Sequence, residues 1–130
     1  DNFFTFWFRF IYKYSYMLEI ENYGSVKTII DRDYETFSGL MLERWFKRVL
    51  TEQKAYTRIG GWWDRKGENE IDIVAENELD DAATFFEVKR KTENIDMAKL
   101  ETKAAAFLRV TEAFRGYALS YKGLSMDDML

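Results

Sequence analysis

Hydrophobic positions along the chain follow two different periods. A helical period of about 3.6 residues runs from Tyr34 to Gln53 and again from Asp96 to Phe114. Shorter runs rich in β-branched and aromatic residues have the composition of strands. The expected strands are Tyr56–Trp63, Glu70–Ala75, Thr84–Lys89 and Tyr117–Tyr121. This order predicts an α/β domain with a mixed, mostly antiparallel sheet flanked by helices.

Turn residues predict how the strands are connected. Gly60 and Gly61 interrupt the first strand, which indicates a bulge or a bend. Gly67–Asn69 is typical of a tight turn into the second strand. The polar, acidic run Glu76–Asp81 is long enough for a hairpin connection. The second and third strands are therefore expected to be antiparallel.

The candidate chemistry lies on these two strands. Alternation places Ile71 and Ile73 on one face of the second strand and Asp72 on the other. Glu87 and Lys89 are two residues apart on the third strand, so their side chains point the same way. In an antiparallel pair, Asp72 and Glu87 become neighbours. Two acids and a lysine in this arrangement can hold a divalent metal ion against a phosphodiester.

A metal ion would relieve the repulsion within this pair of acids. Two carboxylates about 5 Å apart repel by roughly 3 kcal/mol at an effective dielectric constant near 20. Such a pair is tolerated when one acid is protonated or when a cation lies between them. Mg²⁺ suits Asp72 and Glu87, because it accepts one or two carboxylates and completes its octahedron with water and phosphate oxygens. Lys89 would orient or deprotonate a water, or stabilise the charge that develops on phosphorus.

The alternative interpretation is a solvated, salt-bridged surface, which is common on the exposed face of an antiparallel hairpin. Two observations argue against it. Phe85, Phe86 and Val88 flank Glu87, so the third strand is expected to be buried on both faces, where an unpaired carboxylate is costly. Asp72 likewise interrupts an apolar run.

Glu43 is the third candidate metal ligand. On the helix Tyr34–Gln53 it lies at the border between the apolar stripe and the basic face, where a carboxylate is half buried. The alternative is that Glu43 merely pairs with Lys47 one turn later, which stabilises a helix by only about 0.2 to 0.5 kcal/mol.

These residues match a known pattern. Glu43 on a helix, Asp72 on a strand and the run Glu87-Val88-Lys89 resemble the PD-(D/E)XK nuclease superfamily. The match extends to one branch of it. The runs Arg58–Ala75 and Phe86–Arg90 look like the uncharacterised domain at the carboxy end of archaeal-type AAA+ ATPases, and the first ten residues look like the segment that leads into that domain.

The resemblance implies a restriction-endonuclease-like core of helix, three-stranded meander, helix and strand. It implies Asp72 and Glu87 as ligands of Mg²⁺ or Mn²⁺, with Lys89 as the catalytic lysine and Glu43 as the helix acid. The backbone carbonyl of Val88 would add a ligand. DNA is the implied substrate, and the ATPase part of the same longer chain is the implied partner.

Composition excludes several other chemistries. The 130 residues are 47% apolar and 18% aromatic, which is enough for one hydrophobic core. The absence of histidine excludes Ser-His-Asp hydrolases and almost every zinc enzyme. We therefore expect no zinc, and no organic cofactor. The absence of cysteine excludes disulfides and suits a reducing compartment, so we expect a cytoplasmic protein.

Three segments are expected. Residues 1–33 form an aromatic-rich helical arm, residues 34–124 the nuclease-like core, and residues 125–130 a frayed tail. The arm carries ten aromatic residues within the first 23, too many to leave in water. It would pack as a local core helix, on the nuclease-like core, on a further domain, or on a second copy as a dimer. Arg9 and Lys13 interrupt its apolar stretch, which argues against a membrane span.

Basic residues are concentrated despite the net charge of −4. Residues 44–66 hold seven basic and two acidic side chains. A basic rim around an acidic metal centre is what phosphate binding requires, whereas the alternative is an ordinary mixed-charge surface. The candidate nucleic-acid contacts are Arg44, Lys47, Arg58, Arg65, Lys66, Arg90, Lys91 and Lys103.

Two functions of different classes follow. The first is a Mg²⁺-dependent DNA phosphodiesterase module that serves an AAA+ ATPase. The second is a catalytically silent nucleic-acid-binding or oligomerisation module that regulates the ATPase. A toxin-like or defence nuclease is a third, weaker alternative.

Overall fold

The elements of the chain are seen in a computed structural model, which describes residues 2–129 and the side chains from residue 4 onward. The chain divides into two units, residues 1–41 and 42–130, which are described separately. α3 is a long helix, Tyr23–Glu52, whose residues from Leu42 onward belong to the second unit.

The first unit is helical. It contains α1 (Asn2–Phe6), a π-helical segment η1 (Trp7–Tyr12), α2 (Ser15–Glu19) and the first part of α3. Its buried centre is aromatic. Phe10 is fully buried, and its ring lies 5.0 Å from that of Phe6 and 5.4 Å from that of Phe37. Part of the aromatic arm is therefore a local core.

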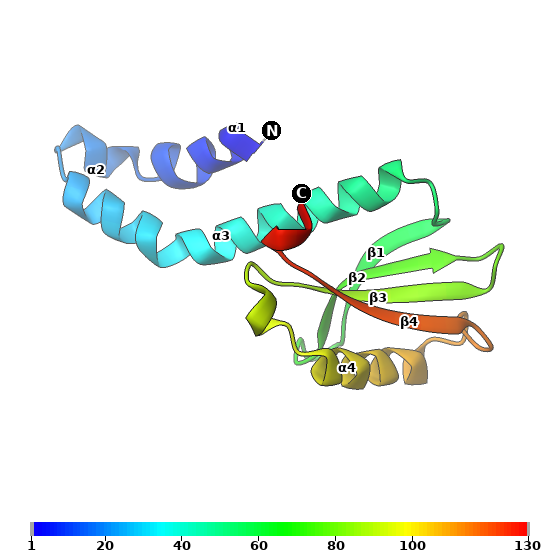
Figure 1. Cartoon of the computed structure of the whole chain (residues 1–130). Coiled ribbons are helices and arrows are strands. Elements are labelled where there is room, and N and C mark those ends of the chain that lie inside the picture. Colours follow the sequence, from blue (N-terminus) through cyan, green and yellow to red (C-terminus); the bar gives the residue numbers. More distant parts are fainter. Residues whose placement is uncertain (1, 130) are drawn as a thin grey trace. The chain divides into compact units, whose positions relative to one another are not determined.

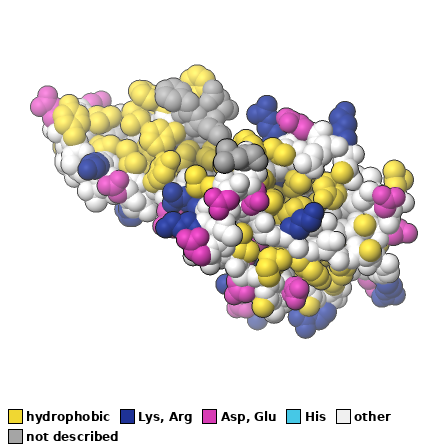
Figure 2. Space-filling model, in the orientation of Figure 1, with side chains coloured by type: hydrophobic (Ala, Val, Ile, Leu, Met, Phe, Trp, Pro, Cys, Tyr) yellow, Lys and Arg dark blue, Asp and Glu magenta, His cyan; other side chains and the backbone are white. Residues whose placement is uncertain are grey.

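Other aromatic side chains of the first unit remain at the surface. Figure 2 shows hydrophobic side chains gathered over this unit. Those with more than half of their surface exposed are Phe4, Phe8, Tyr12, Tyr16 and Tyr23. Although α3 has 30 residues, neither it nor any other helix in the described part of the chain is apolar enough along its length to cross a membrane.

The second unit is built on a four-stranded sheet in the order β1-β2-β3-β4. Neighbours along β1, β2 and β3 are antiparallel, whereas β4 pairs with β3 in parallel. The expectation of an α/β fold with a mixed, mostly antiparallel sheet is confirmed. The elements after α3 are β1 (Arg58–Trp63), β2 (Glu70–Asn77), β3 (Ala82–Val88), η2 (Thr92–Asn94), α4 (Met97–Val110), β4 (Ala118–Leu124) and η3 (Met126–Met129).

Helices cover both faces of this sheet, α3 on one side and α4 on the other (Figure 1). Residues of both faces of β3 are buried, as its apolar sequence predicts. The core on the α3 side contains Leu42, Phe46, Leu50, Ile73, Ala75 and Phe86. The core on the α4 side contains Ile71, Val74, Ala83, Phe85, Leu100, Ala104, Phe107 and Phe114.

A bulge in β2 decides where Asp72 points. Gly60 pairs with Val74 and Trp62 with Ile71, so Asp72 and Ile73 together lie opposite Gly61 alone. The predicted irregularity at the glycines is confirmed, but the extra residue is in β2. Because a bulge reverses the alternation of side chains, the expectation that Ile71 and Ile73 share a face is wrong. Ile71 packs on the α4 side and Ile73 on the α3 side.

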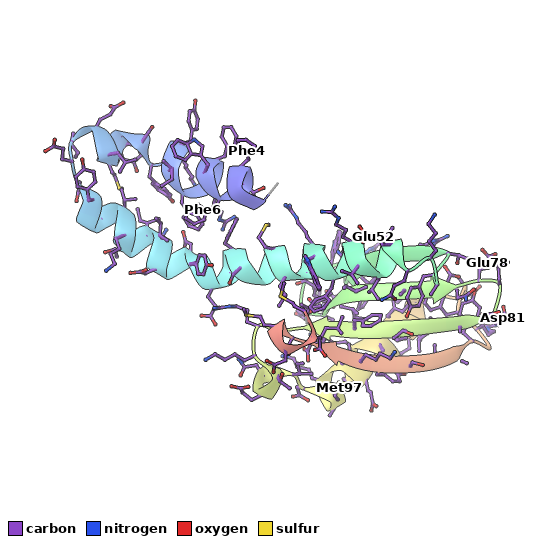
Figure 3. All side chains as sticks on the ribbon, turned by 45° about the horizontal axis from the view of Figure 1, so that its top comes forward. Phe4, Phe6, Glu52, Glu78, Asp81 and Met97 are labelled. Carbon is purple, nitrogen blue, oxygen red and sulfur yellow. The ribbon has the colours of Figure 1, made fainter. Side chains whose placement is uncertain are left out.

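The expected bounds of the hairpin connection are corrected by the position of Glu76. Glu76 belongs to β2 rather than to the hairpin connection, and it is buried where Tyr117 donates to it over 2.7 Å. The turn itself contains Glu78 and Asp81, at the opposite end of the sheet from Met97 at the start of α4 (Figure 3).

The carboxy-terminal tail is ordered rather than frayed, as far as Met129; Leu130 lies outside the described residues. Ser125 is fully buried, and its hydroxyl shares a hydrogen bond of 2.7 Å with that of Thr92. The carboxylate of Asp127 accepts from the Thr92 hydroxyl over 2.8 Å, and the backbone N–H of Met126 donates to the carbonyl of Arg90. These bonds hold the tail against the segment that follows β3.

Candidate functional site

Asp72 is the centre of the candidate site. It is half-buried, and its Oδ2 accepts a hydrogen bond from the backbone N–H of Val88 over 2.8 Å. The last ladder pair of β2 and β3 is Ile73 with Phe86, so Asp72 and Glu87 occupy the next positions of the same register. Asp72 and Glu87, which were predicted to be neighbours, therefore lie at the point where β2 and β3 stop pairing.

The charges around Asp72 show which side chains share its surroundings. Burial raises the pKa of Asp72 above its ordinary value. The hydrogen bond from Val88 opposes this shift, the charge of Glu43 adds to it, and the charges of Lys89 and Lys103 oppose it. Residues from α3, β2, α4 and the end of β3 thus act on one carboxylate.

Glu87 is the most buried acid of the site, with 4% of its surface exposed. Its Oε2 accepts a hydrogen bond from the backbone N–H of Asp96 over 2.8 Å. Its Oε1 lies 4.0 Å from the Nζ of Lys103. Asp96 itself caps α4, because its side chain accepts from the N–H of Lys99. Glu87 therefore ties the end of β3 to the start of α4.

Glu43 has the half-buried position that its place on the helix predicts. Its Oε1 lies 2.9 Å from the Nζ of Lys47, so the pairing one turn apart is present. This contact does not remove Glu43 from the site, because its charge also acts on Asp72.

β3 ends at Val88, and Lys89 follows it directly. The side chain of Lys89 is exposed, and its backbone N–H donates to the carbonyl of Leu124 over 3.0 Å. The backbone of Val88 contributes its N–H to Asp72. The ligand role of the Val88 carbonyl stays a prediction.

The donor chemistry of the site suits a hard cation, since the candidate ligands are all oxygen atoms. Within the described residues, however, no three Asp, Glu, His or Cys side chains stand together as a metal-binding group. Glu43 and Glu87 each have a lysine partner, whereas burial is the largest influence on Asp72. The site is a set of acids interleaved with lysines.

A family match covers most of the region just described. Residues 7–107 match the DUF234 family, whose description is archaeal and bacterial proteins of unknown function. The chain belongs to the DUF234 family. It is similar to an uncharacterised protein of Methanocaldococcus jannaschii, MJECL04, with 37% identity over 98 residues. The match covers 70% of this chain and 21% of that protein, and no solved structure matches the chain.

In this DUF234 chain, the predicted basic contacts differ in where they lie. Lys47 and Lys103 lie in the site itself, beside Glu43 and Glu87 respectively. Arg58 lies elsewhere, with its Nε 3.7 Å from the Oε1 of Glu76 toward the hairpin end of the sheet. Arg44, Arg65, Lys66 and Lys91 are exposed. Arg90 is half-buried, and its Nε lacks a hydrogen-bond partner within the described residues.

The two tryptophans of β1 in this DUF234 chain differ in position. Trp62 packs on the α4-side core, with its ring 5.5 Å from that of Phe107. Trp63 is 70% exposed. Trp62 is therefore partly buried against the core, and Trp63 is left on the surface.

Sequence reasoning missed Asp64, which holds the turn into β2. Its carboxylate accepts from the backbone N–H of Glu68 over 2.9 Å and from that of Asn69 over 3.2 Å. Burial alone would raise the pKa of Asp64, but hydrogen bonds from Asn69, Glu68 and Gly67 lower it overall. Gly67 adopts a φ of 70°, which glycine tolerates best. An aspartate four and five residues before the donating amides was the available signal.

Proposed function

We propose that residues 42–130 are a Mg²⁺- or Mn²⁺-dependent DNA phosphodiesterase module. The single observation that best supports this proposal is the environment of the Asp72 carboxylate. Its carboxylate is half-buried at the end of the β2–β3 ladder, close enough to Glu43, Lys89 and Lys103 for their charges to act on it. A desolvated carboxylate among lysines and acids is a common feature of active sites.

The acids supply the donors for a hard metal ion. Asp72 and Glu87 would hold it, with Glu43 and the Val88 carbonyl as further oxygen donors. A bound Mg²⁺ or Mn²⁺ would polarise the scissile phosphate and lower the pKa of a coordinated water. The burial of Glu87 and the hydrogen bond that it accepts from Asp96 hold one of these carboxylates in place.

The basic and aromatic residues would bind the substrate. Lys89, exposed at the end of β3, would stabilise the charge on the attacked phosphate. Arg65 and Lys66, in the turn between β1 and β2, would bind neighbouring phosphates. Trp63 offers an exposed ring for base stacking.

The resemblance to the carboxy-terminal domain of archaeal-type AAA+ ATPases supports a place within a larger, ATP-driven protein. The matched relative is also much longer than this chain, since the alignment covers 21% of it. We infer that the module acts in the cytoplasm on DNA delivered by the ATPase part. A PD-(D/E)XK ancestry is part of the same proposal.

The test is cleavage of supercoiled plasmid and single-stranded DNA by the purified chain with Mg²⁺ or Mn²⁺. Asp72→Asn is the matched loss-of-charge variant, because an asparagine oxygen can still accept from Val88. Asp31→Asn, at an exposed position of α3, is the control for the same chemical change. Cleavage that disappears only in Asp72→Asn supports the nuclease. Equal cleavage by wild type and Asp72→Asn rejects this site.

A second candidate function has its own support. Glu43 and Glu87 already have lysine partners, and several aromatic side chains of the first unit are exposed. A catalytically silent nucleic-acid-binding or oligomerisation module would show both features. Light scattering at increasing concentrations, beside a DNA-binding assay without metal, separates the two. Tight DNA binding or stable dimers without cleavage under any metal condition would favour the silent module.

A further inference from the structure

Lys103 has an unusual position for a lysine on an amphipathic helix. Its side chain is only 17% exposed, and its Nζ lies 4.0 Å from the Oε1 of Glu87. Lysine is rarely buried to this degree unless it is paired, because the ammonium is strongly hydrated. Lys99, one turn earlier on α4, is exposed. The Lys103 side chain is therefore buried because of its own position, and not because all lysines on this face of α4 are buried.

The contact between Lys103 and Glu87 is also unlike the other lysine pair of the site. Lys47 and Glu43 are neighbours one turn apart on a single helix, 2.9 Å from each other. Lys103 instead joins α4 to the end of β3, and its charge acts on Asp72 as well. Lys103 thus lies beside the carboxylate of Glu87, and its charge also acts on a carboxylate of a second strand.

The position of Glu87 is fixed by a hydrogen bond that does not involve Lys103. Oε2 is fixed by the backbone N–H of Asp96 at 2.8 Å, whereas the 4.0 Å between Oε1 and Lys103 is longer than a hydrogen bond. Glu87 can therefore keep its position if Lys103 leaves. The flexible stem of four carbon atoms allows Lys103 to swing without a change in the backbone.

We propose that Lys103 is a built-in counter-ion that partly offsets the negative charge of Asp72 and Glu87 in the metal-free protein and is displaced when a divalent cation binds. This rests on the proposed function, because it assigns a second cation to the same carboxylates. Lys103 acts on the metal through these acids and is a positioning residue. Once displaced, its ammonium is released beside the site, where a substrate phosphate would attract it.

The proposal predicts competition between Lys103 and the metal ion. Isothermal titration with Mn²⁺ alone compares wild type with Lys103→Met, Lys103→Arg and the matched control Lys99→Met. Lys103→Met should bind Mn²⁺ about tenfold more tightly, which is the effect of removing one charge-assisted contact. Lys103→Arg keeps the charge and should bind like wild type, and Lys99→Met should also be unchanged.

A second readout uses no DNA. Without metal, Lys103→Met leaves the buried acids without their counter-ion and should unfold at a lower temperature than wild type. Saturating Mn²⁺ should raise the unfolding temperature of Lys103→Met by more than that of wild type. Lys103→Gln replaces Lys103→Met in both experiments if the methionine variant fails to fold.

The outcomes separate this inference from the proposed function. Equal Mn²⁺ affinity in Lys103→Met and wild type overturns the counter-ion while leaving the metal site intact. Weaker affinity in Lys103→Met also overturns it, because Lys103 would then help to build the site. If neither wild type nor Lys103→Met nor Lys103→Gln binds Mn²⁺, both the counter-ion role of Lys103 and the metal-dependent function are overturned.

Discussion

The Oδ2 of Asp72 accepts a hydrogen bond from the backbone N–H of Val88 over 2.8 Å, just beyond the last ladder pair of β2 and β3. A carboxylate thus takes the place of a backbone carbonyl as the acceptor for a strand N–H. The bulge opposite Gly61 turns Asp72 toward this position. The side chain that terminates the pairing of two strands is also the centre of the candidate site.

Gly61→Ala should disturb this arrangement. A Cβ at Gly61 would lie 3.2 Å from the carbonyl oxygen of Asp72 and 3.4 Å from that of Ile71, so the bulge would have to shift. Overpacking against backbone of this kind costs about 1 to 2 kcal/mol. The matched control is Gly60→Ala, because a Cβ there meets nothing within 4 Å. Urea unfolding of both variants measures the difference; equal stabilities would contradict the role given to Gly61.

Asp72→Asn should be more stable than wild type at neutral pH. Burial raises the pKa of Asp72 in the folded chain, so the folded state holds this proton more tightly than the unfolded state. The ionisation of Asp72 therefore costs stability as the pH rises through its folded-state pKa. Asparagine avoids this cost and keeps an acceptor for Val88.

The difference between Asp72→Asn and wild type should disappear as the pH falls below the ordinary aspartate pKa of 3.8, where Asp72 is protonated in both states. Unfolding midpoints in urea between pH 3 and pH 8, without metal, measure this. A variant less stable than wild type at pH 7 would show that the carboxylate charge is favourable in the metal-free fold.

Hydrophobic period was sufficient to predict the strands and the α-helices of the second unit and their order. The runs around Ile71 and Phe85 became β2 and β3, and the segment from Asp96 became α4. Pairing the acids required only alternation and an antiparallel connection, both of which are local properties. For this reason Asp72 and Glu87 could be predicted to occupy neighbouring positions.

The partners of these acids could not be predicted, because they come from distant parts of the chain. The N–H of Asp96 and the ammonium of Lys103 reach Glu87 only through the packing of α4 on the sheet. The side of the sheet taken by Ile71 depends on a bulge whose extra residue could belong to either strand. The order of the tail depends on Thr92, which is 33 residues away from Ser125.

Trp62 and Trp63 should separate stability from nucleic-acid binding. Trp63→Ala removes an exposed ring, so we expect a change in stability of about 0.5 kcal/mol or less. If the ring stacks on a base, the same variant should weaken single-stranded DNA binding by about 1 to 3 kcal/mol. Trp62→Ala removes a ring packed near Phe107 and should cost about 2 kcal/mol of stability.

Fluorescence anisotropy with a labelled oligonucleotide, beside urea unfolding, measures both effects of the tryptophan variants. DNA affinity that is unaltered in Trp63→Ala would remove this residue from the proposed interface. Loss of stability in Trp63→Ala as large as that in Trp62→Ala would contradict their different positions on β1.

Ser125→Ala should loosen the segment that follows β3. The hydroxyl of Ser125 is fully buried, shares a hydrogen bond with Thr92 and accepts from the backbone N–H of Asp127 over 3.2 Å. Its loss should cost about 1 to 2 kcal/mol, because the partners left behind are partly buried. Hydrogen exchange in residues 89–95 should become faster. Ser120→Ala, at an exposed position of β4, is the matched control and should leave stability and exchange unchanged.

The hydrogen bond between Tyr117 and Glu76 should make the stability of the fold sensitive to alkaline pH. Its length is 2.7 Å, and it raises the pKa of Tyr117 from 10.0 to about 12. Because the folded-state pKa is the higher one, the protonated hydroxyl stabilises the fold fully below pH 10, and this contribution is lost as the pH rises toward 12. Tyr117→Phe lacks the contribution at every pH. It should therefore unfold at a lower urea concentration than wild type at pH 8, and the two midpoints should converge between pH 10 and pH 12.

Because Tyr117 lies near the hairpin end of the sheet, Mn²⁺ affinity should be the same in both proteins at pH 8. A midpoint difference that stays constant up to pH 12 would show that the tyrosine acts through packing on Phe114, 5.1 Å away between ring centres, and not through its hydroxyl.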